Sequence, residues 1–331
     1  MRAAALLAMV CLVLLLSGVA HAQPRPSPPG PPATGPGSVD YPHAGVTVSG
    51  TSGIPGGFVL YEPADPAPAS APVVVYLHGA QGVDTRDLSD AQLRHLARRG
   101  NVVVYAEEGT LDVAGYRDAA RRAIGSALDE LARPGHVRPD GGVGFVGHSI
   151  GGLVALSLAA SPGDLPRPSV VVAHDPAGLD YAAFTGIDAS RTTLAGLDPA
   201  TRLLVIEAAT TAGTSNGAAD AIWRNAPTPR AQRNWLRVPS DDRGTPPLVS
   251  DHSGSLAGDV FLGGGSPLDA IDWWGYWRPT DAALAEGFGQ TSDRSVFCSD
   301  ARPECDRVRD MGSWNDGTPV ARIANAGDLG G

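Results

Sequence analysis

Lysine is absent from this chain, and all 25 of its basic residues are arginine, against 35 acidic residues and a net charge of −10. Proteins that bind nucleic acid use clustered cations to release counterions from the phosphates. No such cluster occurs in the sequence. The charge balance therefore argues against a nucleic-acid partner, and we interpret the missing lysine as the codon bias of a GC-rich bacterial genome.

Cysteine is also scarce, with three residues in the whole chain. Cys11 lies within an apolar N-terminal run, which leaves Cys298 and Cys305 as a pair. Two thiols without a nearby histidine or a second pair do not supply the four ligands of a structural zinc site. In an oxidising compartment such a pair is expected to be oxidised. We therefore expect a disulfide between Cys298 and Cys305 and no metal site.

Only one apolar run approaches the length of a membrane span, and it lies at the N-terminus. Arg2 precedes the apolar residues 3 to 16, and the small-residue pattern at residues 20 to 22 (AHA) offers a cleavage site. These features are typical of a signal peptide, and the run is shorter than the roughly 20 residues that a spanning helix needs. We expect a signal peptide over residues 1–22, no membrane span, and a secreted or periplasmic protein.

The composition divides the remainder of the chain into two parts. Residues 23–40 are rich in Pro, Gly and Ser, which predicts a disordered linker. Hydrophobic residues make up 43% of the whole chain, enough for one domain with a sizeable core. We expect residues 41–331 to form this single domain, as a monomer, with a C-terminal extension from about residue 261.

Short β-branched runs alternate with helical patterns along this domain, which predicts a mostly parallel sheet. The runs VVVYL at 73–77 and NVVVY at 101–105 are apolar throughout, as strands buried on both faces require. Strands are predicted over residues 46–48, 58–61, 73–77, 102–105, 143–146, 170–173, 203–206 and 235–238, and helices over 88–99, 113–132 and 150–160. The fold class is therefore α/β, with an eight-stranded sheet flanked by helices. The tail over residues 312–326 is a candidate for one further strand.

The sequence GHSIG at residues 147–151 matches the G-x-S-x-G turn, in which glycines allow a sharp strand-to-helix turn to expose a serine. A second match, GTSNG, occurs at residues 213–217. The first match directly follows a predicted strand and opens an apolar helix, whereas the second lies in a polar loop. This context selects Ser149 as the candidate nucleophile.

A serine hydroxyl needs a base to take its proton, and in this arrangement the base is a histidine after the last strand. Two histidines follow Ser149 in the chain. His174 ends the strand that follows the nucleophile helix, while His252 lies beyond the strand predicted at 235–238. We therefore assign the base to His252.

The acid that orients the histidine has two candidates. Asp175 follows the strand predicted at 170–173, and Glu207 follows the strand at 203–206. The position of Glu207 is the commoner one for the acid, but its closeness to the strand also suits pairing with an arginine. Both candidates stay open at this point.

An oxyanion would be bound by two backbone amides, one after the nucleophile and one after the third strand. Ile150 supplies the first. The second comes from Ala80, in a loop that begins with His78 and Gly79.

Three segments resemble one group of enzymes: YLHG at 76–79, GHSIGG at 147–152 and HDPAG at 174–178. They are similar to the chlorophyllase and platelet-activating-factor acetylhydrolase branch of the α/β-hydrolase superfamily, to which the bacterial polyester hydrolases are related. The resemblance implies an α/β-hydrolase fold and a serine esterase activity. It also implies that the acid follows the strand after the nucleophile helix, which favours Asp175.

The sequence therefore predicts a secreted serine hydrolase that cleaves a small or lipid-like carboxylic ester through an acyl-enzyme on Ser149. No cofactor is implied, because the sequence has neither a metal-ligand cluster nor a phosphate-binding glycine loop. The alternatives are an exported acyltransferase or peptidase with the same residues, and a non-catalytic binding protein on this scaffold. The aromatic cluster at 272–277 (DWWGYW) either lines an acyl pocket or packs a helix on the sheet.

Overall fold

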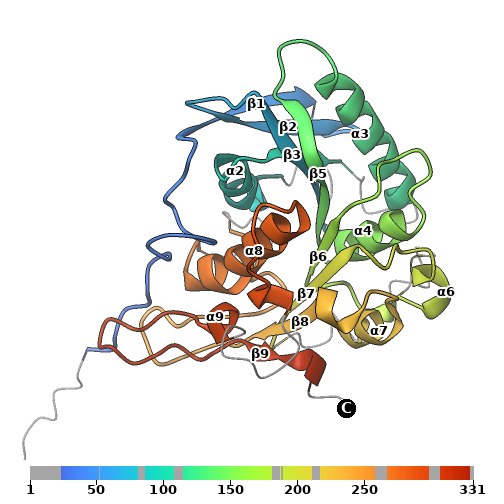
Figure 1. Ribbon diagram of the computed structural model, residues 1–331. Coiled ribbons are helices and arrows are strands. Elements are labelled where there is room, and N and C mark those ends of the chain that lie inside the picture. The colour runs from blue at the N-terminus through green and yellow to red at the C-terminus, as the bar shows by residue number, and fades with distance from the viewer. Residues whose placement is uncertain are drawn as a thin grey trace, which may run out of the picture.

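The computed structural model describes residues 24–51, 53–80, 86–107, 115–180, 187, 189–210, 217–257, 267–297 and 306–328. Within these residues, nine strands form one sheet in the order β1-β2-β4-β3-β5-β6-β7-β8-β9 (Figure 1). The strands are β1 (Gly45–Thr51), β2 (Phe58–Ala64), β3 (Ser70–Leu77), β4 (Val102–Ala106), β5 (Arg138–His148), β6 (Val170–His174), β7 (Arg202–Ala208), β8 (Arg233–Val238) and β9 (Ala324–Asn325).

The six central strands from β4 to β8 are parallel, and β1, β2 and β9 pair antiparallel at the edges. The predicted α/β class and mostly parallel sheet are confirmed. The ninth strand, β9, lies in the tail that the sequence singled out.

The helices follow the predicted alternation with the strands. They are α2 (Asp90–Arg98), α3 (Tyr116–Leu131), α4 (Ile150–Ala160), α6 (Arg191–Leu194), α7 (Ala218–Asn225), α8 (Arg278–Gly287) and α9 (Asp306–Arg309), with a π-helix, η4 (Ile271–Trp277), directly before α8. Short 3₁₀ turns are η1 (Arg86–Leu88), η3 (Arg230–Gln232), η5 (Ser295–Phe297) and η7 (Ala326–Asp328). Helix α4 has the bounds that the sequence predicted, whereas the helix predicted over 88–99 is divided between η1 and α2.

Helices cover both faces of the sheet, with α3, α4, α6 and α7 on one face and α2, α8 and α9 on the other (Figure 1). Successive side chains of β3 point to opposite faces. Val73, Val75 and Leu77 therefore lie in one hydrophobic core, while Val74 and Tyr76 lie in the other. Burial on both faces explains why residues 73–77 of this strand have no alternation of apolar and polar side chains.

The described residues 267–297 and 306–328 form an integral layer of the domain, here called the C-terminal layer. In η4 and α8, Tyr276, Trp277 and Leu284 are buried in the core that contains Val74 and Tyr76 of β3. The aromatic cluster therefore packs against the sheet. No helix in the described part of the chain is long and apolar enough to cross a membrane.

The N-terminal segment differs from the prediction of a disordered linker. Residues 24–40 run along the C-terminal layer (Figure 1). The carbonyl of Gly30 accepts a hydrogen bond from Nε1 of Trp274 at 2.9 Å, and the amide of Gly37 donates to Oδ2 of Asp281 at 2.8 Å. No local sequence signal indicates these contacts, because the partners lie more than 240 positions away, where local composition carries no information about them. The predicted signal peptide lies outside the described residues.

Candidate active site

The candidate residues gather at the carboxyl edge of the sheet. Strand β3 has β4 on one side and β5 on the other, and ligands of open α/β sheets bind at the carboxyl ends of strands where the strand order reverses in this way. Ser149 directly follows β5, Asp175 directly follows β6, and His252 lies in the loop beyond β8. The parallel register places His148 opposite His174 and therefore brings Ser149 and Asp175 side by side.

Ser149 occupies a strained turn between β5 and α4. Its backbone has φ 56° and ψ −121°, a region that non-glycine residues rarely adopt. The turn requires glycine on both sides. A Cβ on Gly147 would lie 2.2 Å from the carbonyl oxygen of Gly151, and a Cβ on Gly151 would lie 2.1 Å from the carbonyl oxygen of Leu77. The amide of Ser149 donates to the carbonyl of His174 at 2.9 Å, which ties the turn to β6.

His252 lies against the serine: its Nε2 atom is 2.9 Å from Oγ of Ser149. A second contact fixes the backbone of His252, because Nε2 of His148 donates to the His252 carbonyl oxygen at 2.8 Å. Burial lowers the pKa of His252, and the Asp251 carboxylate opposes this shift. The imidazole is therefore neutral at pH 7, the state in which it can accept the serine proton.

Asp175 is fully buried and has both carboxyl oxygens engaged. Oδ1 accepts a hydrogen bond from the amide of Ala208 at 2.7 Å, and Oδ2 accepts one from the hydroxyl of Tyr276 at 2.5 Å. Like Ser149, Asp175 has a positive φ, 42°, so both candidate residues at this edge of the sheet have a strained backbone. Burial raises the pKa of Asp175 to about 8, although the two donors act to lower it.

The structure does not join the acid to the base. Nδ1 of His252 is buried without a hydrogen-bond partner among the described residues. Oδ2 of Asp175 instead accepts a hydrogen bond from Tyr276. The Ser149–His252 contact of a catalytic triad is therefore present, and the contact between the histidine and the acid is not.

Glu207, the other candidate acid, faces β8. One of its oxygens, Oε2, accepts hydrogen bonds from Nε1 of Trp235 and from Nη2 of Arg237, both at 3.2 Å. This is the pairing with an arginine that its position next to the strand suggested.

The two candidate oxyanion donors flank the serine. Ile150 is the first residue of α4, and the first amides of a helix have no acceptor within it. A Cβ on Gly79 would lie 3.1 Å from Cβ of Ser149, so the backbone that leads to Ala80 passes directly beside the nucleophile. Ala80 itself is exposed.

His78 is buried at the start of this loop and stabilises its path. Its Nδ1 atom donates to the carbonyl of Gly79 at 2.7 Å, and its ring stacks on Tyr105 with centroids 5.5 Å apart. Burial lowers the pKa of His78 to about 4. This histidine is therefore a neutral structural group at pH 7.

Sequence reasoning missed two residues that contact the candidate catalytic groups, His148 and Tyr276. His148 is the variable position before the serine in the motif, where the sequence pattern assigns no role. Tyr276 belongs to the aromatic cluster at 272–277, more than 100 positions from Asp175. Neither contact has a local sequence signal.

The described residues contain no group of three or more His, Cys, Asp or Glu side chains that could hold a metal ion. The predicted disulfide cannot be compared with the structure, because Cys298 and Cys305 lie outside the described residues.

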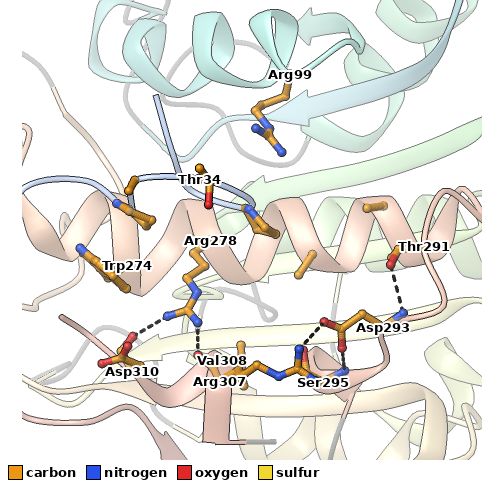
Figure 2. Close-up of a pocket in the computed structure, with 15 residues that line it drawn as sticks. Thr34, Arg99, Trp274, Arg278, Thr291, Asp293, Ser295, Arg307, Val308 and Asp310 are labelled. Carbon is orange, nitrogen blue, oxygen red and sulfur yellow. Dashed lines mark hydrogen bonds and ion pairs between the residues drawn. The ribbon is translucent and has the colours of Figure 1, made fainter. Parts of the chain in front are cut away.

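A separate groove of about 610 Å³ lies between the N-terminal segment and the C-terminal layer. Figure 2 shows Arg278 at its centre, directed toward the chain around Arg307 and Asp310. The Arg278 guanidinium donates to the main-chain carbonyl oxygens of both residues, so its role is to cap the end of α9. Ser149 and His252 do not line this groove.

No protein-family model matches this chain, and no curated protein matches it in sequence. A solved structure that matches is MGS-M1, an alpha/beta hydrolase enzyme from a Medee basin deep-sea metagenome library. The two chains are 18% identical, with a TM-score of 0.53, and the match covers 74% of this chain and 99% of the other. The comparison supports the α/β-hydrolase fold. The resemblance to the chlorophyllase branch stays a prediction.

Proposed function

We propose that this chain is an exported serine hydrolase that cleaves carboxylic esters. The observation behind the proposal is the contact between His252 and Ser149, with Nε2 of the histidine 2.9 Å from a serine Oγ on a strained, glycine-flanked turn. A serine in this environment has a neutral base within hydrogen-bond distance and lies at the carboxyl edge of an α/β sheet, where such sheets bind their ligands.

In the proposed reaction, Nε2 of His252 takes the hydroxyl proton while Oγ of Ser149 attacks the ester carbonyl carbon. The amides of Ile150 and Ala80 stabilise the tetrahedral oxyanion. The protonated histidine then gives its proton to the departing alcohol, which leaves an acyl-serine. Water, deprotonated by the same histidine, hydrolyses the acyl-enzyme and restores the serine.

Asp175 is the acid that we propose for this machinery. It is buried at the end of β6, adjacent to the serine turn, whereas Oε2 of Glu207 binds Trp235 and Arg237. An acid at this position is also what the resemblance to the chlorophyllase and platelet-activating-factor acetylhydrolase branch implies, and we propose that branch for this chain. Export is proposed from the signal-peptide pattern of residues 1–22.

Hydrolysis of p-nitrophenyl butyrate by the purified chain tests the proposal. Wild type is expected to release p-nitrophenol, and Ser149→Ala to lower kcat by about 10³-fold or more, as removal of a nucleophile does. Ser215→Ala is the matched control, because Ser215 is the serine of the second G-x-S-x-G match; it should retain wild-type activity. Equal activity in wild type and Ser149→Ala would contradict the proposal.

An acyltransferase would share every residue named above and differ in its acceptor. Product analysis with an added alcohol separates the two: dominant transfer of the butyryl group to the alcohol over water would replace the esterase assignment. A peptidase is distinguished by faster cleavage of the corresponding anilide than of the ester.

A non-catalytic binding protein is a second candidate, and one observation favours it. The buried Nδ1 atom of His252 lacks a partner among the described residues, as if the base were not oriented for catalysis. Absence of turnover in wild type with every ester tested, together with ester binding that is lost in a Ser149→Trp variant, would support this candidate.

A further inference from the structure

Tyr276 contacts both the candidate acid, Asp175, and the loop that carries the candidate base, His252. Its hydroxyl is 2.5 Å from Oδ2 of Asp175. Its ring packs beside the loop of His252, where a Cβ on Gly254 would lie 3.4 Å from Cε2 of Tyr276. The side chain is fully buried, so both contacts are shielded from water.

The backbone geometry of η4 places Tyr276 against the sheet. η4 is a π-helix, a widened turn that is rare and often found at functional sites. The preceding residue, Gly275, lies directly on β8, because a Cβ there would be 2.9 Å from Cγ1 of Val238. This close approach lets the next side chain reach Asp175 across the strand ends.

We propose that Tyr276 is a positioning residue for the hydrolytic reaction: its hydroxyl donates to Oδ2 of Asp175 and holds that carboxyl, as an ionised acceptor, for Nδ1 of His252. A carboxylate oxygen has two lone pairs. Oδ2 can therefore accept from Tyr276 and from the histidine at once, when His252 becomes protonated during the reaction. The inference rests on the proposed function.

The surroundings of Asp175 explain why a donor is needed there. The ionisable groups that act on it are Glu207 from β7, Asp251 from the His252 loop, and Tyr276. His174 precedes Asp175 in the chain, and its ring contacts that of Tyr276. Besides burial, the carboxylates of Glu207 and Asp251 raise the pKa of Asp175. Burial also lowers the pKa of His174 to about 3, so this neighbour supplies no positive charge at neutral pH.

Two donors act against these influences. The amide of Ala208 and the hydroxyl of Tyr276 lower the pKa of Asp175, which nevertheless remains raised, to about 8. The amide belongs to the backbone, and only proline at position 208 would remove it, with a change in the backbone of β7 itself. Tyr276 is therefore the side chain whose loss should shift the ionisation of Asp175.

The test compares Tyr276→Phe with wild type in two measurements. The first is the pH dependence of kcat/KM for p-nitrophenyl butyrate. The acidic limb of the variant is expected to move to higher pH by about one unit, because loss of a hydrogen bond to the ionised carboxylate raises the pKa of Asp175 by about that amount. Activity at pH 7 should fall about tenfold and recover above the shifted limb, with KM little changed. The second measurement is ¹³C NMR titration of aspartate carboxyls, with Asp175→Asn identifying the resonance, which should show the same shift.

The matched control is Tyr61→Phe. Tyr61 is also a fully buried tyrosine whose hydroxyl donates to an aspartate, Asp90, at 2.8 Å. It lies on β2, outside the candidate site, and its loss should leave the pH dependence unchanged. A limb that stays in place in Tyr276→Phe, or that moves equally in both variants, would overturn the role of Tyr276.

The two measurements separate the two proposals. An inactive wild type would remove the proposed function, while the carboxyl titration would still report whether Tyr276 controls the ionisation of Asp175. If Tyr276→Phe does not fold, site-specific replacement of Tyr276 by 3-fluorotyrosine retains the shape and strengthens the donor. That replacement is expected to move the limb to lower pH, and an unmoved or raised limb would contradict the inference.

Discussion

The imidazole of His148 donates a hydrogen bond from Nε2 to the main-chain carbonyl oxygen of His252, over 2.8 Å. The residue before the candidate nucleophile thus holds the backbone of the candidate base. Since a carbonyl can only accept, this contact places the His148 proton on Nε2. Burial lowers the pKa of His148 well below its usual value, which keeps the ring neutral.

His148→Phe is expected to retain the ring volume and remove this donor. Loss of one buried hydrogen bond costs about 1–3 kcal/mol, so kcat/KM for p-nitrophenyl butyrate should fall about 10- to 100-fold through displacement of His252. His148→Gln keeps an amide donor and should restore part of the activity. Wild-type kinetics in His148→Phe would show that the contact does not position the base.

The pH dependence of wild type follows from the two ionisations in the site. Hydrolysis requires neutral His252 and ionised Asp175. Burial lowers the pKa of His252 below 6.5 and raises the pKa of Asp175 to about 8. We therefore expect kcat/KM to rise with pH and to level off only above about pH 8.

Asp175→Asn should remove the limb near pH 8 and leave the one below 6.5, which belongs to His252. A wild-type profile that is already level at pH 7 would show that Asp175 ionisation does not limit the reaction.

The choice of acid is tested by a pair of isosteric substitutions. Asp175→Asn should lower kcat by about 10²- to 10⁴-fold, because an amide cannot stabilise the protonated histidine. Glu207→Gln should cost less than about tenfold, since it weakens a partly exposed ion pair to Arg237. Steady-state kinetics at pH 9 measures both, and the reverse ranking would assign the acid to Glu207.

Glycine at position 147 is required by the turn. Gly147→Ala places a Cβ against the backbone of Gly151 and Gly152, which should lower the free energy of unfolding by about 3 kcal/mol and abolish turnover by moving Ser149. Gly125→Ala is the control, because no atom lies within 4 Å of its added Cβ in the middle of α3. It should stabilise the fold by about 1 kcal/mol. Urea unfolding measures both, and similar changes in the two variants would contradict the packing argument.

Local patterns were sufficient for the sheet and for helix α4. Continuous β-branched runs identified the central strands, since burial on both faces leaves no polar alternation, and α4 begins directly after the serine turn. The candidate pair Ser149 and His252 was also reached from the sequence, because topology places the ends of parallel strands together.

Long-range contacts were beyond sequence reasoning. Residues 24–40 have the composition of a linker, yet Trp274 and Asp281 bind their backbone. Likewise, nothing near Asp175 in the sequence indicates that Tyr276 engages its carboxyl. Both contacts depend on where the C-terminal layer packs, and a pattern of a few residues does not determine that packing.

The central claim is that Ser149 is an activated nucleophile, and covalent labelling tests it most directly. The purified chain is treated with a fluorophosphonate, and the modified peptide is identified by mass spectrometry. We predict one adduct, on Ser149, with labelling lost in Ser149→Ala and slowed in a His252→Ala variant. No adduct in wild type, or equal labelling in Ser149→Ala, would contradict the claim.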